Sequence, residues 1–399
     1  MLEDLKKAAR SLGAARWRGM LGYTAELHAR SVLAAQPPFR RPWEEIGPGY
    51  VNSPAFGHWD IVHEAMDCLA HEPEHAADQI RNLLAFQGED GFLPGLIVLR
   101  GGKAHWNPEI THPPVWPFAV QELADLYRDD RLLRECLEPL KRQIRWFERK
   151  RAAVGGGFYY EDVVSRRWES GVDEGVRFDQ PVEETPACVD ATAHLYACYE
   201  IAAKWATALG EEASEFSRKA DELGRFIREK LFDAETGFFH DSWAVGRPVR
   251  RALAFEGMWP MVVGAASPEQ AQRVIDENLL RPDRFLTEHP ISTVAVSDPR
   301  FELRMWRGPA WNSMTFWTAR GCARYDRADA ARVLLERALD ASAASYERTG
   351  TIWEFYHPRG GQELDLARKP HTKYNTPCRN YLGHNPLIAM ARLWEAVLA

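Results

Sequence analysis

The sequence lacks several features that would place it in a large class of proteins. It has no Lys- or Arg-rich run, and its formal net charge is −7. A chain of this charge has no basic footprint for nucleic acid or an anionic membrane surface. No apolar run is long enough to span a membrane, and residues 1–7 lack the apolar core of a signal peptide. We therefore expect a cytoplasmic protein with neither nucleic acid nor membrane as a partner.

Cysteine is scarce too, and its spacing excludes the common thiol-based sites. The six cysteines are scattered and form no CxxC pair, which is typical of reduced thiols in a cytosolic protein. Residues 71–75 read HEPEH and match the zinc-protease string HExxH, which needs both histidines on one helix face. Pro73 disfavours that helix and is better suited to the first turn of a new one. We expect no metal and no cofactor.

Helical periodicity dominates what is present. Apolar residues recur at three- and four-residue steps, and no run of alternating strands separates the periodic segments. Gly-aromatic loops recur at residues 91–92, 157–158 and 237–238, so the chain resembles an array of helical hairpins. The sequence predicts an all-α fold, a six-hairpin (α/α)₆ barrel, as one catalytic domain over residues 1–399, with long loops at one rim. Besides one or two opening helices and one that starts at Asp60, the predicted helices are 76–88, 116–128, 131–150, 187–208, 212–231, 267–279, 310–323, 327–346 and 384–397.

Long interhelical loops carry the candidate site, since a rigid helical ring can make them converge. Asp173 lies between Gly171 and Gly175, and these glycines allow a tight loop that holds the carboxylate at a cavity wall. Glu354 is the second loop carboxylate set among aromatic residues. The alternative is that both are ordinary charges on solvated loops.

Two carboxylates in different environments fit glycosidic bond cleavage. One carboxyl group must protonate the departing oxygen, while a second, ionised group acts on the other face of the sugar. The chain also has an excess of aromatic residues, with 15 Trp, 12 Tyr and 18 Phe, and loop tryptophans can stack on sugar rings. Arg307 could orient hydroxyls or a carboxylate. The predicted stacking residues, each of which could instead be a core residue, are Trp168, Trp306, Trp311 and Trp353.

The motifs over residues 50–360 resemble the glycoside hydrolase family 63 and trehalase-like group of inverting α-glycosidases, which have an (α/α)₆ barrel. The most specific piece is residues 306–311, Trp-Arg-Gly-Pro-Ala-Trp, which includes Gly308. Residues 170–173, Ser-Gly-Val-Asp, resemble the segment that carries the general acid, which implies this role for Asp173. The segment around Glu354 is similar to the one that carries the general base. Trp59-Asp60 resembles the sugar-binding Trp-Asp pair, although Asp60 alone could be a helix N-cap.

Departures from the family pattern leave the substrate open. Glu174-Gly175-Val176-Arg177 replaces Asn-Ser-Pro-Arg, and His112 stands where Gln commonly precedes Pro-Pro. The short chain resembles a bacterial branch that includes hydrolases of mannosylglycerate and glucosylglycerate. An acidic aglycone needs a cation near it, for which Arg177 and Lys373 are the candidates. The substrate-binding residues predicted in full are Tyr50, Trp59, Asp60, His112, Trp168, Arg177, Trp306, Arg307, Gly308, Trp311, Trp353 and Lys373.

The leading hypothesis is an inverting α-glycoside hydrolase that acts on a small α-glucoside or α-mannoside. One alternative keeps the barrel but has the chemistry of an N-acylglucosamine epimerase, which uses a pair of inward histidines. The other is a non-catalytic carbohydrate-binding toroid, which needs the tryptophans but not the carboxylates. The sugar, the linkage and the oligomeric state stay open. The histidines available to an epimerase are His58, His112, His240, His289 and His371.

Overall fold

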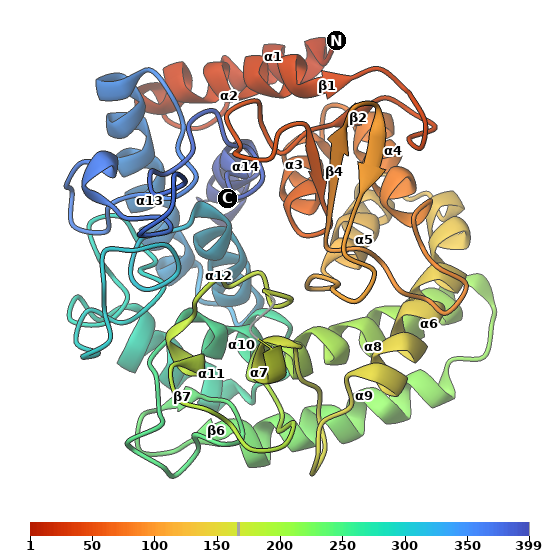
Figure 1. Cartoon of the computed structure of the whole chain (residues 1–399), viewed down its shortest axis with the longest axis vertical. Helices are drawn as coiled ribbons and strands as arrows, with labels where there is room; N and C mark the ends of the chain where they lie inside the picture. Colours follow the sequence, from red (N-terminus) through yellow and green to blue (C-terminus); the bar gives the residue numbers. More distant parts are fainter. Residues whose placement is uncertain (166–167, 399) are drawn as a thin grey trace.

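Helices are the main regular structure of the computed structural model, which describes residues 1–165 and 168–398 (Figure 1). Every helix that the periodicity predicts is present, with its ends shifted by a few residues. Two of the predicted helices, 212–231 and 267–279, end in a short π-helical turn, at Ile227–Leu231 and Ile275–Leu279. The helices are α1 Glu3–Ala9, α2 Arg18–Ser31, α3 Asp60–Cys68, α4 Pro73–Leu84, α5 Trp116–Tyr127, α6 Arg131–Lys150, α7 Asp162–Ser165, α8 Val189–Leu209, α9 Ser214–Phe226, α10 Trp259–Val262, α11 Pro268–Val274, α12 Asn312–Arg324, α13 Ala328–Thr349 and α14 Leu387–Leu398.

Local sequence explains where several helices begin and end. Pro73 is the first residue of α4, as predicted, so residues 71–75 do not form one turn of helix. Ser267 and Gln270 form a reciprocal capping box at the start of α11. Gly210 and Gly350 follow α8 and α13 in the left-handed conformation, with φ of 74° and 68°, the usual role of glycine after a helix.

Three small antiparallel sheets lie in the loops of this helix-rich fold, and the helical periodicity did not predict them. The largest has the order β3-β4-β5. Its β4-β5 hairpin turns through Gly101 and Gly102, both at positive φ. A Gly-Gly pair is a strong hairpin signal, but a prediction from helical periodicity does not use it. The strands are β1 Val32–Leu33, β2 Trp43–Glu44, β3 Ala55–Gly57, β4 Leu96–Arg100, β5 Lys103–His105, β6 Phe232–Asp233 and β7 Phe238–Phe239.

The helices contact one another in a closed circuit. Each of α3, α5, α8, α10, α12 and α14 packs against the next, and α14 packs against α3. Their sequence neighbours α4, α6, α9 and α13 pack on them, and α2 packs against both α13 and α14. Figure 1 looks down on this arrangement, with the long loops and the β3-β4-β5 sheet in front of the helices.

One large hydrophobic cluster runs from Leu2 to Ala391 and joins the elements of the circuit. Polar contacts of His63 join α3 to α12 and to the segment before α14. His63 of α3 accepts a hydrogen bond from Trp317 Nε1 of α12 at 2.9 Å, and its other ring nitrogen contacts the carbonyl oxygen of Gly383 at 2.6 Å. All six cysteines are unpaired and buried. Within the described residues no helix has the length and apolarity that crossing a membrane requires.

Candidate active site

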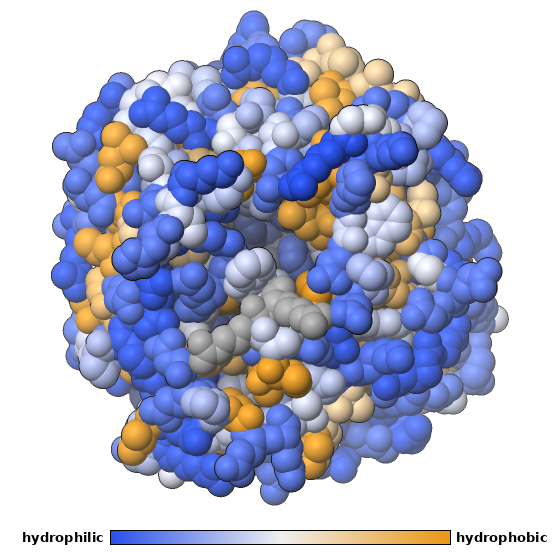
Figure 2. Space-filling model, in the orientation of Figure 1, coloured by the Kyte–Doolittle hydropathy of each residue, from blue (hydrophilic) through white to orange (hydrophobic). Residues whose placement is uncertain are grey.

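The long loops surround a cavity of about 560 Å³, a size typical of small-ligand pockets. Figure 2 shows the face of the molecule hollowed near its centre, with mostly hydrophilic side chains around the opening. Both predicted catalytic carboxylates line this cavity. The predicted site residues on its wall are Tyr50, Trp59, Asp60, His112, Trp168, Asp173, Trp306, Trp311 and Glu354.

Buried hydrogen bonds shape the loop that carries Asp173. The Glu169 carboxylate is fully buried and pairs with Arg151, with Nε–Oε2 and Nη2–Oε1 distances of 2.7 and 2.8 Å. The backbone and hydroxyl of Ser170 donate to Asp162 at 2.8 and 3.0 Å. Gly171 follows with φ of 74°. The loop therefore has the tight, non-helical form that the glycines predict. Hydrogen bonds of two buried carboxylates, Glu169 and Asp162, hold it in place.

Asp173 makes an ion pair at the cavity wall. Its Oδ2 lies 2.8 Å from Lys369 Nζ, and the same ammonium lies 4.3 Å from the centroid of the Trp168 ring. Burial raises the pKa of Asp173, while Lys369 and Arg368 act in the opposite direction. The balance of these effects leaves the pKa of Asp173 above its usual value.

Glu354 lies in a contrasting environment. Its two oxygens accept a two-point ion pair from Arg368, with distances of 2.6 and 2.9 Å, and Oε2 also accepts from the backbone N–H of Cys378 at 3.1 Å. The side chain is 2% exposed. Fixed donors stabilise its negative charge and leave lone pairs that can face a water molecule.

Asp60 is buried at the start of α3, where it is the first helical residue and Trp59 is the N-cap. The hydroxyl of Tyr381 donates to Asp60 Oδ1 at 2.8 Å. Burial raises the pKa of Asp60 to about 7, partly offset by that hydrogen bond. A Cβ atom at Gly57 or Gly383 would lie only 2.0 or 2.3 Å from an oxygen of the Asp60 carboxylate, so neither position has room for a side chain. Two glycines thus make room for this carboxylate, which is more than an N-cap requires.

The tryptophans on the cavity wall stack mainly on one another. Trp306 lies parallel to Trp311 at 3.8 Å and to Trp59 at 5.8 Å between ring centroids, and all three are at most 2% exposed. Their faces are therefore largely covered by other rings, so Trp306 and Trp311 present edges to the cavity. Trp168 is different, since it is 47% exposed.

Five predicted binding residues lie off the cavity wall. Arg177 is buried in a cluster with three carboxylates, and Arg307 pairs with Asp179 and Glu302. Gly308 packs against the backbone, because a Cβ atom there would lie 2.3 Å from the carbonyl oxygen of Glu302.

The other two predicted binding residues, Trp353 and Lys373, contact neighbouring side chains away from the cavity. Trp353 is buried beneath the guanidinium of Arg379, and Lys373 is exposed beside Tyr374. Neither side chain lines the cavity.

Several residues of the cavity wall carry no sequence motif. Arg368 and Lys369 come from the C-terminal loop, four to five residues before the lysine that the sequence suggested. A charged pair in a polar loop gives no signal of what it faces, so only the fold could reveal them. The wall residues that the sequence did not predict include Asn52, Arg100, His105, Trp106, Asn107, Arg368, Lys369, Tyr381 and His384.

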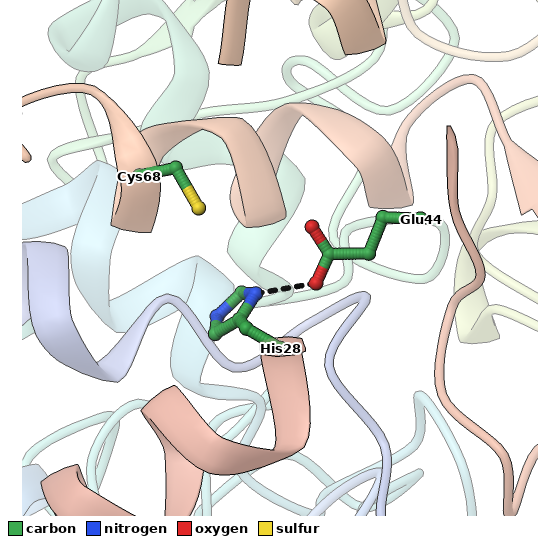
Figure 3. Close-up of side chains that lie close together, drawn as sticks. All are labelled: His28, Glu44 and Cys68. Carbon is green, nitrogen blue, oxygen red and sulfur yellow. Dashed lines mark hydrogen bonds and ion pairs between the residues drawn. The ribbon is translucent and has the colours of Figure 1, made fainter. Parts of the chain in front are cut away.

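Two buried groups of side chains away from the cavity have the chemistry of metal ligands. In each group, however, a basic side chain already pairs with the carboxylates. His28, Glu44 and Cys68 lie close together in the interior, as Figure 3 shows, and His28 Nδ1 lies 2.6 Å from Glu44 Oε1. Burial opposes the charge of His28, but Glu44 and Asp67 outweigh this and raise its pKa to about 10. The second group is Cys188, Asp190 and Asp241, where the Arg177 guanidinium takes the place of an ion.

Of the five histidines suggested for an epimerase, four lie off the cavity wall, although two others, His105 and His384, do line it. Of the five, His112 lines it, while His58 is buried outside the wall and His371 is exposed. His240 and His289 are buried and hydrogen-bonded elsewhere. The five suggested histidines therefore give no support to the epimerase alternative.

A helix-rich fold with two loop carboxylates and a buried Trp-Asp pair around a cavity of this size fits a carbohydrate-active enzyme. The model of the mannosylglycerate hydrolase MGH1-like glycoside hydrolase domain matches residues 54–375, so the chain belongs to this family. This membership confirms the predicted class, an inverting glycoside hydrolase.

Curated and solved relatives agree with this assignment. The chain is 24% identical over 382 residues to mannosylglycerate hydrolase MGH1 of Selaginella moellendorffii, covering 76% of this chain and 75% of that one. It has the fold of the family 63 mannosylglycerate hydrolase of Thermus thermophilus in complex with glucose. That match has a TM-score of 0.72 and 22% identity, covering 93% and 98% of the two chains. The Thermus enzyme in complex with Tris and D-glycerate matches equally well, with a TM-score of 0.72, 20% identity and 94% and 99% coverage.

Proposed function

We propose that the chain hydrolyses a small α-glycoside with inversion, with Asp173 as the general acid and Glu354 as the general base. The observation that carries this proposal is that both carboxylates, from loops about 180 residues apart in sequence, line one cavity in different environments. Asp173 has a raised pKa, and Glu354 is bound by fixed donors. This is the division of roles that an acid and a base need.

The reaction then follows from the two positions. Asp173 gives its proton to the glycosidic oxygen as the bond from that oxygen to the anomeric carbon breaks. Glu354 accepts a proton from a water molecule that attacks the same carbon from the opposite face, so the configuration inverts. Asp60 and Tyr381 are placed to bind hydroxyls of the sugar, and Trp59, Tyr50 and His112 complete the wall around it.

The aglycone is an acidic alcohol of the glycerate type in this proposal, and the sugar is an α-mannoside or α-glucoside. Relatives named mannosylglycerate hydrolases and a Thermus structure with D-glycerate support this class. Besides Arg368, which is bound to Glu354, the cavity wall supplies cations at Arg100 and Lys369, whereas Arg177 and Lys373 lie elsewhere. We therefore assign aglycone recognition to the former pair.

The proposal also takes the fold as a six-hairpin (α/α)₆ barrel that forms one domain over residues 1–399. The closed circuit of helix contacts and the single large core support it. Residues 166–167 and 399 of that range lie outside the described part of the chain. A second domain would be exposed by a stable fragment in limited proteolysis.

The function is tested with α-mannosylglycerate, α-glucosylglycerate and the matched glycerol glycosides. We expect release of free sugar from at least one glycerate glycoside, and no epimerisation of free N-acylglucosamine. Sugar release only from neutral oligosaccharides would replace the acidic aglycone. No hydrolysis of any α-glycoside, with sugar binding retained, would support the non-catalytic toroid.

A further inference from the structure

The ion pair between Lys369 and Asp173 has a consequence for the acid. Lys369 Nζ contacts Asp173 Oδ2 at 2.8 Å over the face of Trp168, at a wall position 22% exposed on the lysine side. An ammonium at this distance favours the ionised carboxylate. A general acid, however, must carry its proton when the glycoside is bound.

Other charged groups face Asp173, and they do not resolve this conflict. Glu354 and Asp60 oppose its ionisation, whereas Arg368 favours it but is bound to Glu354 by two hydrogen bonds. Burial raises the pKa of Asp173, and Lys369 is the largest effect in the opposite direction. Burial is the largest effect, and among the charged side chains around Asp173, Lys369 has the strongest influence on whether this site holds a proton.

We propose that Lys369, through its contacts with both groups, makes protonation of Asp173 depend on the charge of the aglycone. A carboxylate on the carbon that bears the glycosidic oxygen lies next to the acid, within reach of an ammonium that already contacts it. Lys369 pairs with that carboxylate, and Asp173 loses its counter-ion and takes up a proton from solvent. This inference rests on the proposed function and extends it to the source of substrate selectivity.

The charges balance at each step. Binding brings one negative charge to Lys369, and the proton gained by Asp173 replaces the ammonium as its partner. Asp173 then passes this proton to the departing alcohol oxygen as the glycosidic bond breaks, and its carboxylate pairs with Lys369 again when the acidic product leaves. A neutral aglycone leaves the ion pair intact, so the acid stays ionised and turnover is slow. Selectivity therefore acts on turnover as well as on binding.

The first test compares the pH dependence of kcat on a glycerate glycoside and on its glycerol analogue, since kcat reports the bound enzyme. In the wild type we expect the alkaline fall for the glycerate compound to lie at least one pH unit above that for the glycerol compound. Lys369→Met should remove this difference and raise kcat on the glycerol glycoside at pH 7.5. Lys373→Met is the matched control, because this lysine is exposed in the same loop and should leave both profiles in place. Equal alkaline limbs in the wild type would overturn the proposal.

The second test needs no turnover. Titration calorimetry of D-glycerate in buffers of different ionisation enthalpy measures proton uptake on binding. We expect uptake approaching one proton at pH 7.5 for the wild type and for Lys373→Met, and none for Lys369→Met. Binding without uptake, or no binding of glycerate, would refute the switch. Uptake with no hydrolysis of any glycoside would instead refute the proposed function and leave the switch standing.

Discussion

Gly171 lies directly against the Trp59 ring, where a Cβ atom would come within 2.2 Å of Cε3. The backbone at Gly171 has φ of 74°, which costs a residue with a side chain about 1–3 kcal/mol. Gly171→Ala should therefore displace either the acid loop or Trp59, which both line the site. We expect kcat/KM to fall at least about tenfold, in keeping with the sensitivity of catalysis to small misplacements.

Gly210→Ala is the matched control for this substitution. Gly210 has the same φ of 74° after α8, but a Cβ atom there meets nothing within 4 Å. The control should lose about 1 kcal/mol of unfolding free energy and keep its kcat. Equal losses of activity in both variants would show that backbone strain, and not the contact with Trp59, is responsible.

Removing the acid should affect substrates according to their leaving groups. Asp173→Asn should lower kcat by about a hundredfold or more on a natural glycoside, because the alcohol must depart with a proton. A nitrophenyl glycoside should lose much less, since its leaving group needs no proton. Glu174→Gln is the control, because this exposed neighbour pairs with Arg304 outside the cavity. A similar loss on both substrates would assign the acid to another residue.

Inversion can be observed directly. If Glu354 activates water, proton NMR of the fresh product should show the β-anomer of the sugar before mutarotation. Glu354→Gln should lower kcat at least about a hundredfold with binding retained, since the amide can still accept from Cys378 and Arg368. An initial α-anomer would make Glu354 a nucleophile.

The sequence predicted the helices well because most of them bury an apolar face, and the three- and four-residue spacing of such a face can be recognised within a short stretch of sequence. It missed β3-β4-β5 because β3 and β5 are only three residues long, and because β4, with the sequence Leu-Ile-Val-Leu-Arg, does not alternate between apolar and polar residues. The Gly-Gly turn at residues 101–102 was the available signal. Helices can thus be predicted from the sequence, whereas short paired β-strands inside loops can be predicted only from the residues of their turns.

For the site, too, residues within sequence motifs could be predicted and residues outside them could not. Asp173, Glu354 and the Trp59-Asp60 pair belong to motifs, and all lie on the cavity wall. Arg177 and Lys369 show why charges outside motifs were harder to place. Arg177 is only four residues past Asp173, yet it turns into a buried cluster of carboxylates, while Lys369, 196 residues from Asp173, reaches the acid. Proximity in sequence does not predict which loops converge.

The last prediction concerns the buried cluster around His28, which joins four elements. His28 of α2 bridges Glu44 of β2 and Asp67 of α3, and Asp67 also accepts from the backbone N–H of Ala389 in α14 at 2.7 Å. The folded pKa of His28, about 10, lies above its usual 6.5. The stabilisation is therefore complete below pH 6.5 and is lost as the pH rises toward 10.

Denaturant unfolding at pH 6 and pH 9.5 checks this expectation. The wild type should lose on the order of a few kcal/mol more between these pH values than His28→Gln, which has no titrating group at this position. His240→Gln is a control of opposite sign. Burial lowers the pKa of His240 to about 4, so its effect on stability appears as the pH falls below 6.5 and not above it. If the wild type and His28→Gln lose the same free energy between pH 6 and 9.5, His28 is neutral in the folded protein and the charged bridge does not exist.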